Sequence, residues 1–290
     1  MATLDGGRDR DAPVTAVVPL KHYKESFLRE AFDSLAVQSC PAWRAVVVVE
    51  PSDVDAFAAV LERELADPRI IMVTNEGRKL AGAINTGIRR ARTEFVALLL
   101  GDDLWAPDAV EVLNRYIVRH PEVDFFHTSR RVVDDAGKRG SVMRSHDTFR
   151  LEDFVWGSPV KHLLCFRRAK ALAVGGLDES LNSVGPDDYD FPWTMAVSGA
   201  RFHAVPECLY YYRDHREAYR LTTHLPLSVH SREVARILRK HGVGWWTVAR
   251  SVLRARRGYL RQCLYRNALD KWLKERIGFD PHRGWREPYP

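Results

Sequence analysis

Short uninterrupted apolar runs alternate, along the first hundred residues, with longer stretches in which apolar residues recur at helical spacing. The apolar runs cover residues 14–19, 45–49, 70–73 and 95–100. Continuous apolar runs of this length are typical of strands buried on both faces of a parallel sheet. The helical stretches between them cover residues 26–37, 54–65 and 81–91. This alternation predicts an α/β fold with a Rossmann-like, mainly parallel central sheet flanked by helices.

Beyond residue 105 the alternation is weaker. A helix is expected to open at Pro107, because Val110, Leu113 and Ile117 form one apolar face and proline suits a first helical turn. Residues 123–127 and 131–133, followed by a turn at 134–137, are expected to be extended or to form a hairpin. Further strands are expected at 162–166 and 208–212, a helix at 188–197, and helical structure from residue 228 onward.

The charge of the chain is unevenly distributed. The net charge is +6, but residues 231–276 hold 13 Lys or Arg against 3 acidic residues, so the remainder carries about 6 − 10 = −4. Residues 1–12 are polar and expected to be disordered, and they do not resemble a secretory leader. The longest aliphatic runs are far below the roughly 20 residues of a membrane-spanning helix. A cytoplasmic protein with at most peripheral membrane contact is therefore expected.

Two carboxylates follow the apolar run at residues 95–100, in the segment Gly101-Asp102-Asp103. Ligands of open α/β sheets gather beyond the carboxyl ends of the strands. Carboxylate oxygens at such a place suit Mg²⁺ or Mn²⁺, ions that bridge a diphosphate. The alternative is structural: Asp103 caps the following helix and Asp102 is solvated.

Two further polar clusters carry candidate chemistry. Asp187, Asp188 and Asp190 crowd the start of a predicted helix, where they either stabilise its dipole or include a carboxylate with raised proton affinity that acts as a base. Downstream, Arg213 is followed by His215, and this pair either serves the structure or supplies a phosphate-binding cation and a neutral imidazole for a metal.

In their order along the chain, these motifs resemble the family 2 glycosyltransferases of the GT-A fold over about residues 14–223. The resemblance implies an inverting transfer of a sugar from a nucleotide-diphosphate donor, linked to UDP, GDP or TDP, onto a hydroxyl. It also implies a catalytic domain at residues 13–225, with a nucleotide-binding half at 13–105 and an acceptor-binding half at 106–225.

The resemblance assigns the catalytic and metal-binding roles. Asp188 falls on the general base of the family, with Asp187 and Asp190 as second choices. Asp102 and His215 fall on the ligands of a divalent cation, Mn²⁺ or Mg²⁺. If the match to the family is displaced by one residue, the base is a neighbour of Asp188. Alanine substitutions along the acidic cluster distinguish these carboxylates.

The resemblance also assigns the binding residues. For the donor nucleotide these are Pro19, Leu20, Glu50, Arg78, Lys79, Asn85, Gly101, Asp102 and Asp103, and for phosphate they are Arg213 and Arg220. The chain departs from the family at Leu100 and Pro51, where acids that contact the nucleoside are common, so the base is left open. The acceptor is a saccharide, a lipid-linked molecule or a small molecule. Its region includes Trp156, His162, Gly176, Asp187 and Asp190.

The basic extension at residues 226–290 is predicted to form amphipathic helices, with one apolar face through Leu260 and Leu264 and another through Trp245, Val248 and Val252. Such a face packs on the catalytic domain, on a second copy in a homodimer, or on an anionic membrane. No nucleic acid is expected, because no recognised nucleic-acid motif accompanies the charge. The rival functions are a nucleotidyltransferase that makes sugar nucleotides and a non-catalytic membrane or nucleic-acid binding module.

Overall fold

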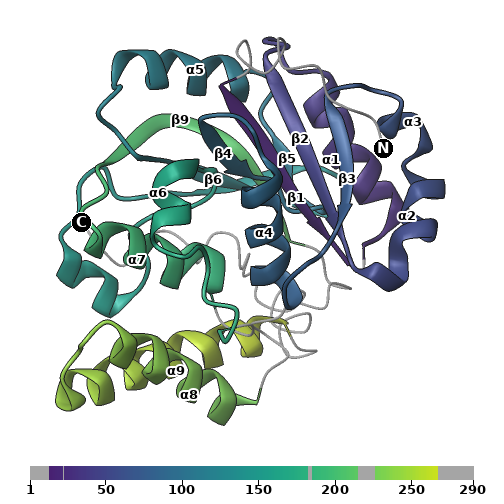
Figure 1. Ribbon diagram of the computed structural model, residues 1–290. Coiled ribbons are helices and arrows are strands. Elements are labelled where there is room, and N and C mark those ends of the chain that lie inside the picture. Colours follow the sequence, from purple (N-terminus) through teal and green to yellow (C-terminus); the bar gives the residue numbers. More distant parts are fainter. Residues whose placement is uncertain (1–12, 22, 182–184, 215–225, 267–290) are drawn as a thin grey trace.

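A central sheet, with nine strands among the residues that the structure describes, forms the core of the fold (Figure 1). The computed structural model describes residues 13–21, 23–181, 185–214 and 226–266. The strands are β1 (Val14–Leu20), β2 (Trp43–Val49), β3 (Ile70–Thr74), β4 (Phe95–Leu98), β5 (Leu104–Trp105), β6 (Phe125–Val133), β7 (Arg139–Met143), β8 (Leu164–Arg167) and β9 (Phe202–Arg213).

The first half of the sheet is parallel and has the order β3-β2-β1-β4. Val17 of β1 pairs with Val46 of β2 on one side and with Leu98 of β4 on the other. All seven residues of β1 and all four of β4 are buried, as expected for strands covered on both faces. The parallel β-α-β half predicted from the apolar runs is therefore confirmed.

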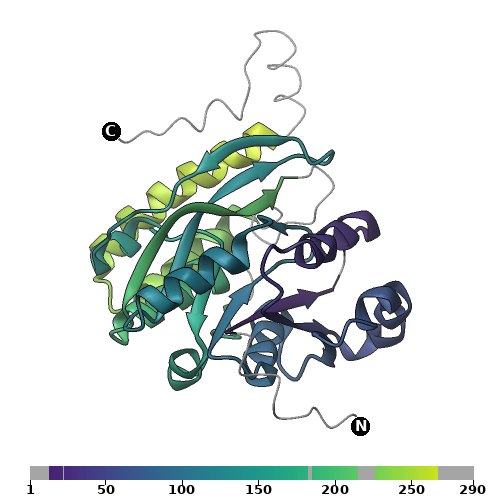
Figure 2. The ribbon, with the colours of Figure 1, turned by 90° about the horizontal axis from the view of Figure 1, so that it is seen from above.

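The second half of the sheet is mixed. β8 runs antiparallel to both β4 and β6 and joins the two halves, and β9 runs parallel to β6. β5 pairs with the end of β9, while β7 extends from β6 as a hairpin. Figure 2 shows β9 and β6 curving side by side. The expected turn at residues 134–137 connects β6 to β7.

Helices cover both faces of the sheet. The α-helices are α1 (Glu25–Ala36), α2 (Val54–Val60), α3 (Glu62–Leu65), α4 (Lys79–Arg90), α5 (Ala109–Arg119), α6 (Arg168–Ala173), α7 (Phe191–Val197), α8 (Leu227–Lys240) and α9 (Trp245–Arg266). One apolar cluster joins the sheet to α1 and α5, and a second joins its other face to α4, α6 and α7. The buried faces therefore use the 3.6-residue periodicity visible in the sequence.

Several element boundaries differ from the prediction. The helix expected over residues 54–65 is two helices, α2 and α3, which meet at Leu61. Val37 lies beyond the end of α1 and is exposed rather than part of its apolar face. The helix expected from Asp188 begins at Phe191, because the residues before it form one turn of π-helix, η4 (Pro186–Asp190).

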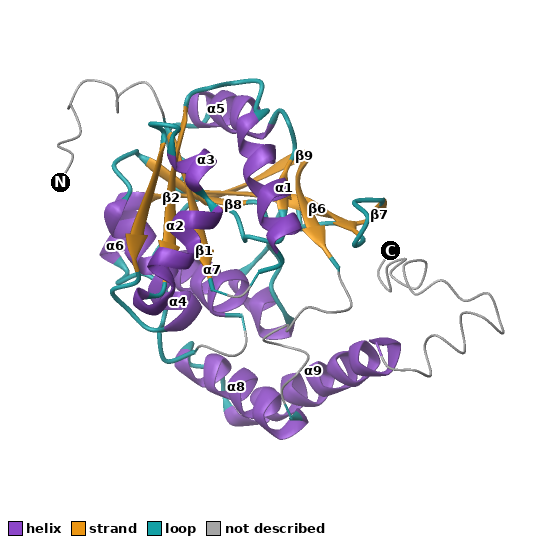
Figure 3. Cartoon of the chain, turned by 90° about the vertical axis from the view of Figure 1, so that its right-hand side faces the viewer, coloured by secondary structure: helices purple, strands orange, loops and turns teal. Residues whose placement is uncertain are grey.

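The C-terminal helices α8 and α9 form a layer of their own against the second half of the domain (Figure 3). Val234, Ile237 and Leu238 of α8 and Val248 of α9 share an apolar cluster with Phe154, Leu181 and Trp193. Of the faces predicted for this region, Val248 is buried, whereas Trp245 and Leu260 are exposed. One face of the two helices therefore packs on the second half of the α/β domain. None of the helices that the structure describes is long and apolar enough to cross a membrane.

Candidate active site

The carboxyl ends of β1, β2 and β4 meet at one edge of the sheet, and the loops that follow them carry polar residues. Tyr23 follows β1, Glu50 follows β2, and Asp102 follows β4. Gly101 precedes Asp102 and allows the loop to pass close to β1, because a Cβ there would lie 2.6 Å from Leu20 Cδ2. The topology thus places the predicted residues Glu50 and Asp102 at one edge of the sheet, together with Tyr23, which was not predicted.

Asp103 is buried, and both of its carboxylate oxygens are used by β9. Tyr210 Oη donates to Oδ2 and the backbone N–H of Arg213 donates to Oδ1, each over 2.7 Å. Burial, together with the charge of Asp102, raises the pKa of Asp103 well above its usual value. Asp103 therefore connects the loop after β4 to β9. The structural alternative, in which Asp103 caps the following helix, did not include this contact with β9.

Tyr23 lies at this edge in a negative electrostatic environment. Its hydroxyl donates to the backbone oxygen of Pro19 over 3.0 Å. Burial raises the pKa of Tyr23, and the negative charges of Asp102, Asp103 and Asp187 raise it further. Carboxylates from the loop after β4 and from the acidic turn η4 therefore act on one point, which makes this edge a place for cations and for the groups they bind.

Arg213 lies beneath the loop after β4 with its side chain fully buried. Its guanidinium donates to the backbone oxygens of Asp102 over 2.9 Å and Asp134 over 3.3 Å, pairs with Glu30, and lies 4.3 Å from the ring centroid of Phe27. The guanidinium of Arg213, which was predicted to bind phosphate, thus interacts with groups of the protein itself. The other two predicted residues of this region, His215 and Arg220, lie outside the described residues.

The acidic turn η4 separates its three carboxylates. Asp187 is buried, with Oδ2 3.3 Å from Nε2 of His162. Burial alone raises the pKa of Asp187, but the His162 ring and the backbone N–H groups of Asp187 and Asp188 outweigh it and leave that pKa below its usual value. Asp187 and His162, both predicted in the acceptor region, are therefore direct partners.

Asp190 points the other way, into the contact with the C-terminal helices. Lys240 Nζ lies 2.7 Å from one of its oxygens and His241 Nε2 lies 2.9 Å from the other. Asp190 is therefore an anchor for the end of α8. Asp188, between these two buried acids, is only half-buried.

A lysine lies within electrostatic reach of Asp188. Lys161 is in the loop before β8, and its Nζ donates to the backbone oxygen of Ser158 over 2.7 Å. Burial and the charge of Arg130 lower the pKa of Lys161 to about 8, while the negative charge of Asp188 acts in the opposite direction. Lys161 is thus a basic group near Asp188 in the predicted acceptor half.

Asn75, which follows β3, organises the edge beyond β2. Its Nδ2 donates to Glu50 Oε1 over 3.0 Å, and its Oδ1 accepts the backbone N–H of Gly77 over 2.8 Å. Arg78 and Lys79 then begin α4 with exposed side chains, Lys79 at a positive φ of 55°. Pro19 and Leu20, by contrast, are buried within β1.

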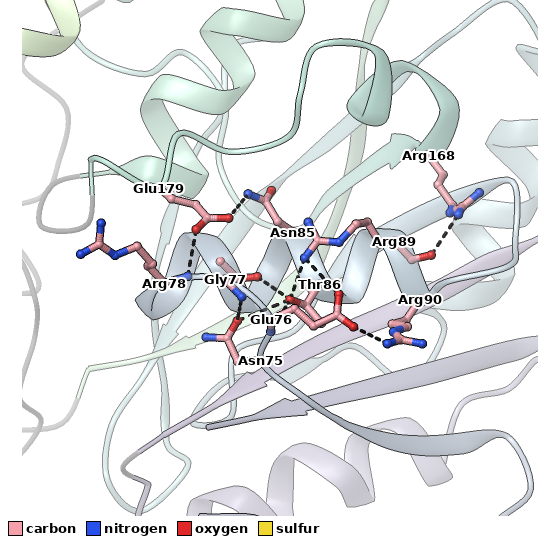
Figure 4. Close-up of polar contacts among 11 residues, drawn as sticks. Asn75, Glu76, Gly77, Arg78, Asn85, Thr86, Arg89, Arg90, Arg168 and Glu179 are labelled. Carbon is pink, nitrogen blue, oxygen red and sulfur yellow. Dashed lines mark hydrogen bonds and ion pairs between the residues drawn. The ribbon is translucent and has the colours of Figure 1, made fainter. Parts of the chain in front are cut away.

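Asn85 links α4 to the glycine turn, residues 174–178, which contains the predicted acceptor residue Gly176. Figure 4 shows its contact with Glu179, just beyond this turn. Asn85 accepts the backbone N–H of Leu177 over 2.7 Å and donates to Leu177 O and to Glu179 Oε1 over 2.9 and 3.1 Å. Glu179 in turn accepts the backbone N–H of Arg78 over 2.9 Å. Gly176 has a φ of +75°, and a Cβ there would lie 2.3 Å from Asn85 Oδ1. Asn85 and Glu179 therefore form a brace between the start of α4 and the glycine turn.

This brace predicts a coupled effect on stability. Asn85→Ala should lower the free energy of unfolding by about 2 kcal/mol, because buried polar groups lose their partners. Gly176→Ala should cost about 3 kcal/mol through the close contact and the positive φ. The double variant should cost about 1 kcal/mol less than the sum, since removing the asparagine makes room for the new methyl group. Urea unfolding of the four proteins measures the coupling, and strict additivity would contradict the proposed contact.

The donor set for a metal is incomplete within the described residues. Among them, no three His, Cys, Asp or Glu side chains are grouped so that they alone could hold an ion. Asp102 contributes to the negative potential around Tyr23. One carboxylate, completed by phosphate oxygens, waters and an imidazole such as His215, is a set that Mg²⁺ and Mn²⁺ accept. The residues present thus fit an ion shared with a bound phosphate.

Trp156, predicted in the acceptor region, lies where the domain meets α9. It is 41% exposed, at the end of the short 3-10 helix η3 (Leu151–Trp156). The guanidinium groups of Arg250 and Arg254 lie 6.0 and 5.9 Å from its ring. Trp156 is therefore shared between the predicted acceptor half and the basic extension.

Sequence analysis missed the residues that hold the predicted ones in place. Tyr23 and Tyr210 flank the loop after β4, Glu179 completes the brace, and Lys240 and His241 bind Asp190. Tyr23 lies directly after β1, so the strand-end rule that singled out Asp102 could have found it as well. The partners of Asp190 lie about 50 residues away in the sequence and leave no local pattern.

Comparison with known proteins places this geometry in a family context. Residues 15–170 match the profile described as "Glycosyl transferase family 2". The chain is 27% identical, over 69% of its length, to the O-antigen biosynthesis protein RfbC of Myxococcus xanthus, of which it spans only 16%.

Solved structures share the fold. TarS 1-349 of S. aureus in complex with UDP-GlcNAc has a TM-score of 0.63 at 19% identity, with 87% of this chain and 72% of that chain covered. The mannosyltransferase PcManGT of Pyrobaculum calidifontis, in complex with GDP-Man and Mn²⁺, has a TM-score of 0.56 at 18% identity, with 94% and 82% covered. The expected GT-A type fold class is thereby confirmed.

Proposed function

The chain belongs to glycosyl transferase family 2, and we propose that it transfers a sugar from a nucleotide-diphosphate donor to an acceptor hydroxyl with inversion at the anomeric carbon. The observation that carries this proposal is that carboxylates from two loops, Asp102 after β4 and Asp187 in η4, both act electrostatically on the half-buried Tyr23 at the carboxyl edge of the sheet. The similarity to RfbC supports a role in the synthesis of a polysaccharide or glycoconjugate.

The donor nucleotide lies, in this proposal, along the carboxyl edge of β1, β2 and β4. Glu50 is held by Asn75 and offers acceptors for a base or ribose. Arg78 and Lys79 present cations at the start of α4, where phosphate is favoured. The solved relatives bind UDP-GlcNAc and GDP-Man, which supports a UDP or GDP donor. TDP is the remaining candidate.

Asp102 and His215 would hold a divalent cation, Mn²⁺ or Mg²⁺. The ion supplies positive charge to the diphosphate as it leaves. Asp102 is preferred to Asp103 because both oxygens of Asp103 are used by β9. The Mn²⁺ bound by PcManGT supports this assignment. Arg213 acts here by fixing the backbone of Asp102, over 2.9 Å.

Asp188 is the proposed general base. Asp187 and Asp190 are buried and engaged with His162 and with Lys240 and His241, whereas Asp188 is half-buried. Asp188 accepts the proton of the acceptor hydroxyl while the oxygen attacks the anomeric carbon from the face opposite the diphosphate.

The acceptor is proposed to bind on the side of η3 and the glycine turn. His162 and Asp187 form its polar wall, Gly176 lets the turn approach α4, and Trp156 lies at its outer end. A saccharide fits this combination of an aromatic ring and paired polar groups. Lipid-linked and small-molecule acceptors share the same hydroxyl chemistry.

Calorimetric titration of the protein with UDP, GDP and TDP, with and without Mn²⁺, tests the proposal. We expect one nucleotide to bind at least about tenfold more tightly with Mn²⁺, since a cation held by Asp102 and His215 would attract the diphosphate. Binding of none of the three, under conditions where the protein is folded, would contradict a transferase. Formation of pyrophosphate from a sugar phosphate and a nucleoside triphosphate would instead indicate a nucleotidyltransferase.

A further inference from the structure

We propose that the outward face of α9 docks on an anionic lipid surface. This face consists of Trp246, Leu253 and Leu260, with Arg250, Arg256 and Arg257 beside them. The proposal rests on the side chains of α9 and not on the transfer reaction. It is therefore tested separately from the proposed function.

The opposite face of α9 is already used. Val248, Ser251 and Tyr259 are buried, and Ser251 Oγ donates to the backbone oxygen of Val155 in η3 over 2.6 Å. His230 of α8 stacks on Tyr259 with ring centroids 4.4 Å apart. These contacts fix the rotation of α9 about its axis, and so determine which residues face outward.

The outward face is apolar along its middle. Trp246, Leu253 and Leu260 are spaced seven residues apart, which places them on one side of the helix. They are 69%, 58% and 45% exposed. Trp245, 63% exposed, stacks on Trp246 and widens the apolar surface at the start of the helix. Figure 3 shows α9 along the edge of the described part of the molecule.

Arginines border this apolar stripe. Arg250 and Arg257 follow it on one side and Arg256 on the other, and all three are exposed. The sequence of α9 contains no Asp or Glu, while its arginines are Arg250, Arg254, Arg256, Arg257, Arg261 and Arg266. An apolar stripe between cationic flanks is the pattern of a helix that lies in a membrane interface. Its apolar side chains enter the acyl boundary while the arginines meet lipid phosphates.

The charge argues against the other occupants of this face. In a symmetric dimer the same face meets itself, which would bring arginines of one copy against those of the next. A nucleic acid would satisfy the arginines but leave Trp246, Leu253 and Leu260 in water. An anionic bilayer satisfies both kinds of side chain at once.

The position of α9 gives the docking a consequence for the site. Arg250 and Arg254 contact Trp156, and Ser251 contacts Val155, so η3 lies directly on α9. A membrane bound to the outward face would therefore lie beside the acceptor half of the domain. This arrangement suits an acceptor presented at a lipid surface.

Vesicle co-sedimentation of the full chain tests the proposal. Vesicles of phosphatidylcholine with about one third phosphatidylglycerol should bind on the order of 100-fold more tightly than pure phosphatidylcholine, at about fivefold for each of three arginines. High salt should remove most of this difference. The variant Leu253→Ser/Arg257→Gln should bind the anionic vesicles at least about tenfold more weakly.

A matched control is available on α5, which lies across the molecule from α9 (Figure 1). Val118→Ser/Arg119→Gln removes one exposed aliphatic side chain and one exposed arginine there, and should leave vesicle binding unchanged. Circular dichroism and thermal unfolding verify that both variants are folded. Equal binding to neutral and anionic vesicles, or equal binding by the α9 variant and the wild type, would overturn the proposal. So would a dimer in light scattering that only the α9 variant dissociates.

Discussion

Asp188→Asn is expected to lower turnover about a thousand-fold while the midpoint of urea unfolding stays nearly the same. A positioned general base contributes roughly 10²–10⁴-fold to such a reaction, and asparagine keeps the shape of the side chain without its proton affinity. The half-buried position of Asp188 makes a large loss of stability unexpected. Initial rates of nucleotide release with the cognate donor, together with unfolding curves, measure both quantities.

The two neighbouring acids provide the controls. Asp190→Asn should act mainly on stability, because Lys240 and His241 lose a charged partner in a buried contact. Asp187→Asn should weaken acceptor binding through His162 more than it lowers turnover at saturation. If Asp187→Asn abolishes turnover while Asp188→Asn retains it, the base has been assigned to the wrong carboxylate.

The second large effect separates Asp102 from Asp103. Asp102→Ala should weaken Mn²⁺-dependent nucleotide binding about 100-fold with little change in stability, since its carboxylate is the one assigned to the ion. Asp103→Ala should lower the free energy of unfolding by about 3 kcal/mol, because Tyr210 and the backbone of Arg213 lose a buried acceptor. Calorimetry and urea unfolding of each variant distinguish the two roles.

Asp108→Ala is a suitable reference, because Asp108 is exposed and lies only a few residues beyond this pair. It should leave nucleotide binding unchanged and lower the free energy of unfolding by no more than about 1 kcal/mol, through the lost negative charge at the start of α5. If Asp103→Ala were as stable as this reference, its buried hydrogen bonds would not hold β9 as described. If Asp102→Ala kept full Mn²⁺-dependent binding, the cation would have to be held elsewhere.

The parallel half of the fold was predictable because its strands are buried on both faces and are therefore continuous apolar runs. The register of β1 between β2 and β4 follows from that burial. The mixed half was less predictable, since β8 enters between β4 and β6 and runs against both. Strand order in such a sheet depends on contacts between distant segments, which no local periodicity records.

For the site, the place of a residue after a strand could be used for prediction, whereas the partners of its side chain could not be predicted. Asp102 and Asp103 were singled out because they follow a buried strand, where ligands of α/β sheets gather, and the family resemblance selected Asp102 as the proposed metal ligand. The partners of Asp103 are more than a hundred residues away on β9, and the pairing of Arg213 with Glu30 spans even more of the chain. Asp188 was proposed as the base from the family resemblance, whereas the difference in burial between Asp188 and its neighbours Asp187 and Asp190 is visible only in three dimensions.

The contact of Asp190 with the end of α8 has a consequence for how the chain can be divided. A boundary near residue 226 coincides with a change from mixed α/β to helical structure, yet α8 supplies both the charged partners of a buried acid and part of an apolar cluster. Cutting there would leave Asp190 uncompensated and Trp193 in water. The helical extension is thus part of the folded unit of the enzyme. A catalytic domain truncated before it is a poor starting point for crystallisation or engineering.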